Sequence, residues 1–251
     1  MHWKVFFASA TGKYHLDGDQ PCQDAGHFAI AEEVFVGVVC DGAGSADQGQ
    51  VGAQFLARAV SESVAGALVS GTLAVAGGPD TLEHLQEIIG GARDTLVGIA
   101  ALQQRELRDF ASTLLGCFST PTGGCFFHIG DGFGVQRAGT GTRAISVPEN
   151  GEFADQTYFV TDESWCDHLR VTPLGAVEPG CLIGLMSDGT ASFAIDRERT
   201  GFFGPFIDPV VNFLRNTSDA DGSLALQNLL EGEKTFAITG DDKTLLLALA
   251  A

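Results

Sequence analysis

Four apolar runs in this chain each end at an aspartate in a glycine-marked turn. The runs are VFVGVVCDG, CFFHIGDG, CLIGLMSDG and FAITGDD, and their aspartates are Asp41, Asp131, Asp188 and Asp241. A buried apolar run followed by Asp-Gly predicts a strand that presents a carboxylate where the chain turns. One such turn is ordinary hairpin chemistry. Several in one chain predict carboxylates that converge, and grouped carboxylate oxygens suit Mg²⁺ or Mn²⁺.

The order of strand-like and helix-like segments favours an α+β fold. Strands are expected at residues 1–10, 26–31, 34–40, 111–118, 124–129, 134–138, 157–160, 181–187 and 243–249. Helical spacing of apolar residues predicts helices over 48–69, 206–214 and 223–230, and one from 80 to 109 interrupted at Gly90-Gly91. Because strands occur in blocks joined by short turns, we expect antiparallel hairpins, including one across residues 130–132. One domain over 1–251 is expected.

Charge and composition exclude several classes of partner. The net charge is −18, from 14 basic and 32 acidic residues. This argues against nucleic acid and anionic membranes, because both bind a basic face. No run approaches the ~20 apolar residues of a membrane span, and the first apolar segment is too short for a signal peptide. Six dispersed cysteines without a C-x-x-C pair indicate reduced thiols. We expect a cytoplasmic monomer.

Five motifs in order along the chain resemble the metal-dependent type 2C protein phosphatases, in particular a compact bacterial branch with a CQDA-type first motif. They are GKYHLDGDQPCQDA (12–25), VFVGVVCDGAGSADQGQVGA (34–53), FFHIGDG (126–132), LMSDGTA (185–191) and GDDKT (240–244). Each is weak alone, but the five span nearly the whole chain. The resemblance implies a four-layer α-β-β-α sandwich of two antiparallel sheets flanked by helices. It also implies hydrolysis of phosphoserine and phosphothreonine in proteins by a hydroxide that bridges two metal ions.

The resemblance also implies roles for individual residues. Asp41 would bridge two Mn²⁺ or Mg²⁺ ions, with the backbone carbonyl of Gly42 as a further ligand. Asp188 and Asp241 would complete the protein ligands of the second ion, and Asp24 would hold a metal-bound water.

Two more aspartates belong to the same motifs. Asp131 matches the residue that helps to bind a loosely held third ion in many members of the family. Asp242 is expected to support its neighbour or form a turn rather than bind an ion.

The chemistry fits these residue types independently, because a phosphate monoester is an anion that resists attack by another anion. Two divalent ions neutralise its oxygens and lower the pKa of a water between them.

Some positions depart from the family pattern. Gln23 replaces a common glutamate, Ala43 stands where many members have a histidine, and the arginine that often grips the substrate phosphate is missing. Lys13 and His15 are the basic side chains of that segment, so we predict that they bind the substrate. We also predict a catalytic role for His15, because an imidazole can donate a proton to a leaving group or hold a phosphate oxygen.

Two other functions fit the same residues. A type 2C-like module that has lost efficient turnover could bind a phosphorylated partner, and the missing arginine and Ala43 favour this alternative. The retained Asp41, Asp188 and Asp241 disfavour it. A phosphomonoesterase for small molecules is the other alternative, since a metal centre reads the phosphoryl group while the surrounding loops read the rest of the substrate.

Overall fold

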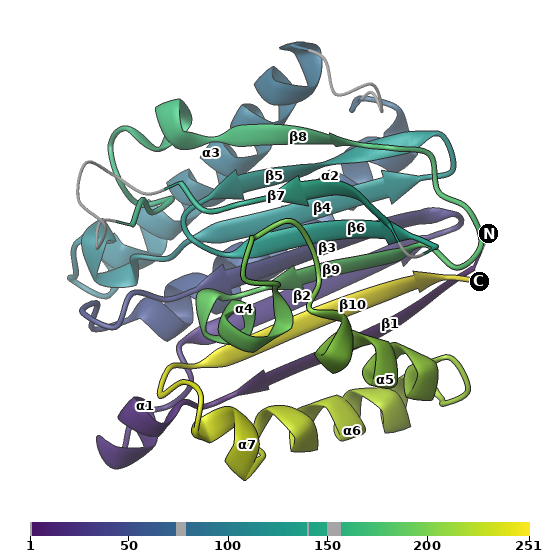
Figure 1. Cartoon of the computed structure of the whole chain (residues 1–251). Coiled ribbons are helices and arrows are strands. Elements are labelled where there is room, and N and C mark those ends of the chain that lie inside the picture. The colour runs from purple at the N-terminus through teal and green to yellow at the C-terminus, as the bar shows by residue number, and fades with distance from the viewer. Residues whose placement is uncertain (1, 74–78, 140, 150–156) are drawn as a thin grey trace.

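The computed structural model of the protein contains two antiparallel sheets that lie face to face, with helices outside each (Figure 1). It describes residues 2–73, 79–139, 141–149 and 157–251. One sheet has the strand order β1-β10-β9-β6-β7, and the other has the order β2-β3-β4-β5-β8. This is the four-layer α-β-β-α sandwich, of the α+β class, that the resemblance implied.

Each sheet is assembled from strands that are distant in the sequence. The first contains β1 (Trp3–Ala10), β10 (Lys243–Ala250), β9 (Leu182–Met186), β6 (Phe133–Ala138) and β7 (Gly141–Ser146). The second contains β2 (Asp24–Ala31), β3 (Val34–Asp41), β4 (Leu114–Thr120), β5 (Gly123–Ile129) and β8 (Arg170–Leu174). Within each sheet, every pair of neighbouring strands is antiparallel.

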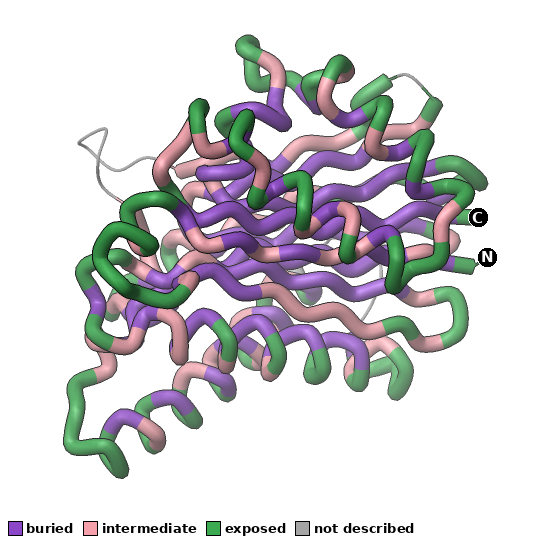
Figure 2. The backbone as a smooth tube through the Cα atoms, turned by 90° about the horizontal axis from the view of Figure 1, so that it is seen from below, coloured by how far each residue is buried: buried purple, intermediate pink, exposed green. Residues whose placement is uncertain are grey.

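Helices cover the outer face of each sheet. The second sheet packs against α2 (Gly49–Ser70) and α3 (Pro79–Leu102), and the first against α4 (Asp188–Ala194), α5 (Gly204–Leu214) and α6 (Asp219–Leu230). The remaining helical segments are short: α1 (Lys13–Asp17), α7 (Glu233–Phe236), and the 3₁₀ turns Leu107–Phe110 and Trp165–His168. Burial is concentrated in the strands and on the sheet-facing sides of the helices (Figure 2).

A separate apolar cluster fills the space between the sheets. Phe35, Leu115 and Phe126 come from one sheet, and Leu185 and Leu246 come from the other. The central strands are therefore covered on both faces, which explains why their sequences are continuous apolar runs rather than alternating patterns. None of the helices in the described ranges is long and apolar enough to cross a membrane.

The expected hairpin across residues 130–132 is wrong. Strand β5 pairs with β4 and β8, whereas β6 pairs with β7 and β9 in the other sheet. Gly130, at φ +112°, turns the chain from one sheet to the other. A side chain there would meet Thr113 Cγ2 at 2.6 Å, so the crossover requires glycine. Asp131 consequently lies at the seam between the sheets.

Other expectations were confirmed or corrected by packing. The strands expected at 1–10, 26–31, 34–40, 181–187 and 243–249 form, as do the helices expected at 48–69, 206–214 and 223–230. The expected strand at 157–160 is wrong, because these residues form no ladder. Helix α3 continues through Gly90-Gly91, and β7, β8 and α4 form in segments for which no element was predicted.

His128 packs in the gap between the sheets. Its Nδ1 accepts a hydrogen bond from Arg170 Nη2 at 3.2 Å and lies 2.9 Å from Ser146 Oγ on the facing sheet. Because an arginine only donates, the proton of the neutral ring is assigned to Nε2. Burial lowers the pKa of His128 to about 3, and the charge of Arg170 acts in the same direction. This histidine is therefore a neutral structural link between the sheets.

Candidate metal centre

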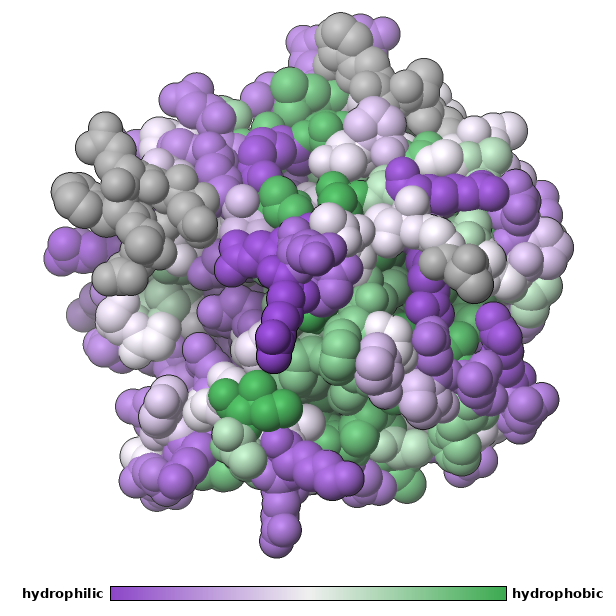
Figure 3. Space-filling model, in the orientation of Figure 1, coloured by the Kyte–Doolittle hydropathy of each residue, from purple (hydrophilic) through white to green (hydrophobic). Residues whose placement is uncertain are grey.

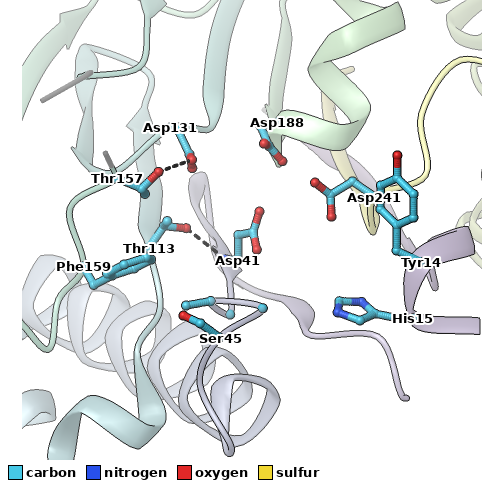
Figure 4. Close-up of a pocket in the computed structure, with 13 residues that line it drawn as sticks. Tyr14, His15, Asp41, Ser45, Thr113, Asp131, Thr157, Phe159, Asp188 and Asp241 are labelled. Atoms are coloured by element: carbon cyan, nitrogen blue, oxygen red, sulfur yellow. Dashed lines mark hydrogen bonds between the residues drawn. The ribbon is translucent and has the colours of Figure 1, made fainter. Parts of the chain in front are cut away.

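A pocket of about 580 Å³ opens where strand ends from both sheets meet. Asp41, Asp131, Asp188 and Asp241 line it, and Figure 4 shows their carboxylates directed toward a common space. They come from the end of β3, the β5–β6 crossover, the first turn of α4 and the loop before β10. The structure therefore brings together the four aspartates that end apolar runs in the sequence. The strand expected before Asp241 is wrong, because Glu233–Phe236 is helical and the next strand begins only at Lys243.

The β2–β3 hairpin places Asp24 beside Asp41. The two residues are direct partners in the antiparallel register. Thr113, just before β4, holds the backbone of Asp41 in place. The Asp41 N–H donates to Thr113 Oγ1 at 2.9 Å, and the Asp41 carbonyl accepts from the Thr113 N–H at 2.9 Å. Asp24 is buried behind the pocket wall, where its Oδ2 accepts a hydrogen bond from Ser187 Oγ at 2.6 Å.

Close backbone packing fixes the approach of α4 to the loop before β10. Gly189 follows Asp188 in α4, and a side chain at this position would collide with the carbonyl oxygen of Asp242. Only glycine allows this contact, so the SDG sequence here reflects a close approach of two backbones as well as a carboxylate. Asp188 and Asp241 face the same pocket as a result.

The electrostatics of the pocket are those of crowded carboxylates. Burial, and then repulsion from Asp131 and Asp241, raises the pKa of Asp188 to about 6. Burial raises the pKa of Asp24 to about 7. The pKa of Asp41 is also raised well above its usual range, first by burial and then by the charges of Asp24 and Asp188. A bound cation would lower these pKa values, because it favours the ionised form of each carboxyl group.

The residues present fit divalent cations. Oδ1 of Asp24, Asp131 and Asp188 is buried and has no hydrogen-bond partner among the residues that the structure describes. The available donors are all oxygens, the ligand type that Mg²⁺ and Mn²⁺ prefer. Within the described ranges, no three acidic, histidine or cysteine side chains already form a closed ligand set.

Gln23 explains one departure from the family pattern. With its amide oriented to donate, Nε2 lies 3.1 Å from the carbonyl oxygen of Gly42 and 2.9 Å from that of Ala43. An ionised glutamate cannot donate to these two carbonyls, so an amide suits this buried position. Gln23 therefore holds the loop that follows Asp41, and a carbonyl oxygen has a second lone pair left for another partner.

His15 lines the pocket, and Asp242 stands behind it. His15 Nδ1 lies 2.9 Å from Asp242 Oδ2. The buried Asp242 carboxylate also accepts hydrogen bonds from the N–H groups of Gly12 and Gln23, both at 2.6 Å. Asp242 is thus a clasp between distant segments rather than a turn former. Lys13 is exposed at the start of α1 and is not among the residues that line the pocket.

Several residues of the site carry no clear signal in the sequence. Thr157 Oγ1 donates a 2.7 Å hydrogen bond to Asp131 Oδ2, and Tyr14 lines the pocket with its ring against Gly240. Tyr14 adjoins His15 within the first motif, which could have drawn attention to it. Thr157 lies in a polar segment with no motif, so only the tertiary structure reveals it.

A buried lysine lies behind the carboxylates. In the described part of the chain Lys243 Nζ has no hydrogen-bond partner, and it lies 3.9 Å from the centroid of the Phe236 ring. Burial lowers the pKa of Lys243, while the negative charge of Asp242 and that of Asp241 oppose the shift. This positive charge offsets part of the repulsion within the acidic cluster.

Two sequence comparisons match this chain along most or all of its length. A family model described as "Protein phosphatase 2C" matches residues 11–231. The chain is also 33% identical, over 262 aligned positions, to serine/threonine-protein phosphatase 3 of Escherichia coli (strain K12), and the alignment covers 100% of both proteins.

Solved structures share the fold at low sequence identity. PppA, a regulatory component of T6SS in Pseudomonas aeruginosa, superposes with a TM-score of 0.67 at 18% identity, covering 100% of this chain and 99% of PppA. RsbX, solved in complex with magnesium, superposes with a TM-score of 0.57 at 11% identity, covering 100% of this chain and 96% of RsbX.

Proposed function

The chain belongs to the protein phosphatase 2C family, and we propose on that basis that its acidic pocket hydrolyses phosphoserine and phosphothreonine in proteins. The observation that most supports this is the convergence of Asp41, Asp131, Asp188 and Asp241 on one space. In the reaction, a water oxygen attacks phosphorus and the phosphoester P–O bond breaks. The protein hydroxyl then leaves with a proton, and inorganic phosphate is released.

We propose Mn²⁺ or Mg²⁺ as the cofactor, two ions and a third held less firmly. Asp41, Asp188 and Asp241, with the carbonyl of Gly42, would hold the first two, and Asp131 with Asp188 the third. When bound, such ions neutralise phosphate oxygens and lower the pKa of water. Asp24 stands beside Asp41 and can orient a water with its unpaired Oδ1.

The acidic cluster favours an enzyme over a module that only binds. Buried carboxylates that repel one another lower the stability of a fold, and nothing in phosphopeptide binding requires them. A binding module would also favour donors over acceptors around the phosphate. The cytoplasmic location and the monomeric state stay predictions from the sequence.

Metal removal tests the proposal. We expect the metal-free protein to release no phosphate from a phosphothreonine peptide or from p-nitrophenyl phosphate, and Mn²⁺ or Mg²⁺ to restore release from both. The measurement is phosphate release in chelator and then in excess metal. Tight peptide binding without release would support the binding module instead. Release from small phosphomonoesters alone would support the small-molecule enzyme.

His15 is proposed as the proton donor to the leaving hydroxyl. Asp242 lies against Nδ1 at 2.9 Å, which leaves Nε2 as the nitrogen that can meet the substrate. A threonine hydroxyl leaves only with a proton, whereas p-nitrophenolate leaves readily without one. We therefore expect His15→Gln to lower kcat on the phosphothreonine peptide about a hundredfold, and to change kcat on p-nitrophenyl phosphate far less.

The comparison of the two substrates makes the His15 test specific. The control is His84→Gln, since His84 lies on α3 and does not line the pocket. Equal losses on both substrates would mean that His15 grips phosphate rather than donates a proton. Unchanged turnover of both would remove His15 from the mechanism.

A further inference from the structure

A second cleft, of about 570 Å³, adjoins the acidic pocket. The two share Asp131, Thr157 and Asp188 in their walls. The other side of the second cleft is formed by the turn that follows α4, where Arg197 and Arg199 line it. A molecule held at the acidic pocket can therefore extend into the second cleft without leaving the surface.

The turn that carries these arginines, residues 195–202, is held by its own hydrogen bonds, and we call it the arginine turn. An antiparallel bridge closes its base. Asp196 Oδ1 accepts from Thr200 N–H at 2.9 Å, and Oδ2 accepts from Thr200 Oγ1 at 2.8 Å. Arg199 has φ +56°, a conformation that needs such support in a residue other than glycine. The arginines therefore project from a preformed turn.

In the described residues, no acidic side chain neutralises either of the two guanidinium groups. Within the described ranges neither forms an ion pair, and Glu198 between them does not line the cleft. The Arg199 guanidinium lies 5.5 Å from the ring centroid of Phe133, which follows the crossover that carries Asp131. Strongly hydrophilic side chains gather on the front of the molecule over α4 and this turn (Figure 3). Only 14 basic residues oppose 32 acidic ones in the chain, so unpaired arginines beside a phosphate pocket are notable.

We propose that the arginine turn is an anion-binding subsite for a second negative charge on the substrate, an acidic or phosphorylated side chain close to the residue being dephosphorylated. The proposal rests on the function proposed above. Successive residues of an extended peptide are ~3.3 Å apart, so near neighbours of the phosphoresidue reach the adjoining cleft. Guanidinium groups match both carboxylates and phosphates through paired hydrogen bonds. The enzyme would thus select phosphoproteins whose phosphorylated site lies in an acidic sequence.

The carboxylates around the cleft set a condition for this selection. Asp131 and Asp188 repel an anion unless cations are bound between them, and Asp196 uses both carboxylate oxygens within the turn. Binding of the second anion is therefore expected to need Mn²⁺ or Mg²⁺ at the first site, even though the arginines themselves need no metal.

The test compares matched substrates with R197Q/R199Q. One set of phosphothreonine peptides carries glutamate or phosphoserine on either side of the phosphothreonine, and the other carries glutamine at the same positions. We expect the wild type to prefer one of the charged peptides about tenfold in kcat/KM, and the double variant to lose that preference. Turnover of the uncharged peptide and of p-nitrophenyl phosphate should stay within about twofold of wild type, because neither carries a second anion.

Two control variants separate the local effect from a change in net charge. E198Q alters the same turn without touching the cleft, and R58Q/R108Q removes equal charge at exposed positions of α2 and the 107–110 turn that do not line the cleft. Both should keep the preference. Equal losses on all substrates would show that the arginines grip the reacting phosphate, and an unchanged preference would show that they bind nothing; either result overturns the proposal.

Peptide binding provides a readout that does not depend on turnover. Affinity for the charged and uncharged peptides, measured by fluorescence anisotropy in Mn²⁺, should show the same preference and the same loss in R197Q/R199Q. If the wild type binds with this preference but hydrolyses no substrate, the proposed function fails and the subsite stands. If it hydrolyses all peptides alike, the subsite fails and the proposed function stands.

Discussion

Asp41→Asn is expected to abolish turnover and at the same time to stabilise the metal-free protein. Asp41 is the central carboxylate of the pocket, and its pKa is raised by burial and by repulsion from Asp24 and Asp188. Asparagine keeps the shape but removes the charge. Loss of a metal-bridging carboxylate should lower kcat/KM on the order of a thousandfold. Relief of the repulsion should raise the free energy of unfolding by about 1 kcal/mol.

Opposite changes in activity and stability make this test informative. Thermal unfolding in chelator should show a midpoint about 2–4 °C higher than that of the wild type. Excess Mn²⁺ should stabilise the wild type and have little effect on the variant, since binding to the folded state alone adds stability. Asp94→Asn, which removes an exposed charge on α3, is the control. A variant that keeps a tenth of the activity, or that unfolds earlier in chelator, would contradict the role proposed for Asp41.

Asp242→Ala is expected to have the largest effect on stability. Its carboxylate accepts hydrogen bonds from the N–H groups of Gly12 and Gln23, both at 2.6 Å, at a site that is only 3% exposed. Alanine would leave two buried N–H groups without acceptors. Each lost partner costs about 1–3 kcal/mol, so we expect the free energy of unfolding to fall by about 4 kcal/mol.

Urea unfolding in chelator measures this loss without a contribution from bound metal. Asp17→Ala, on the exposed side of α1, is the matched control and should change stability by less than about 0.5 kcal/mol. Asp242→Asn should fall between the two, because an amide retains one acceptor oxygen but presents a donor where the second was needed. A loss below about 1 kcal/mol for Asp242→Ala would show that water replaces the clasp.

The strands and helices with strong apolar patterns were predictable from the sequence. Strand β10 reads KTLLLALA and is buried along its length, and α2 shows helical spacing over its full extent. Weak patterns gave wrong predictions where tertiary contacts decide the structure. Residues 157–160 look like a short strand, but Thr157 and Phe159 instead use their hydrogen bonds in the loop beside the pocket. Strand β8 contains Pro173, and its strand structure depends on pairing with β5.

The crossover after β5 shows the limit of local reasoning most clearly. A Gly-Asp-Gly turn between two apolar runs is compatible with a hairpin and with a passage between sheets. The local sequence does not distinguish them, because the difference lies in which distant strands are available to pair. Here β9 takes the place beside β6 that a hairpin would have given to β5.

The apolar runs and the Asp-Gly turns after them predict which carboxylates lie at the ends of buried strands. Each apolar run is buried and an Asp-Gly turn follows it, so Asp41, Asp131 and Asp188 are expected at strand ends. Tertiary packing sets what surrounds them: the clasp formed by Asp242, the amide of Gln23 on the loop that follows Asp41, and the arginine turn across the second cleft. These contacts join segments far apart in the chain, and their energies depend on distance and burial, which no local pattern encodes.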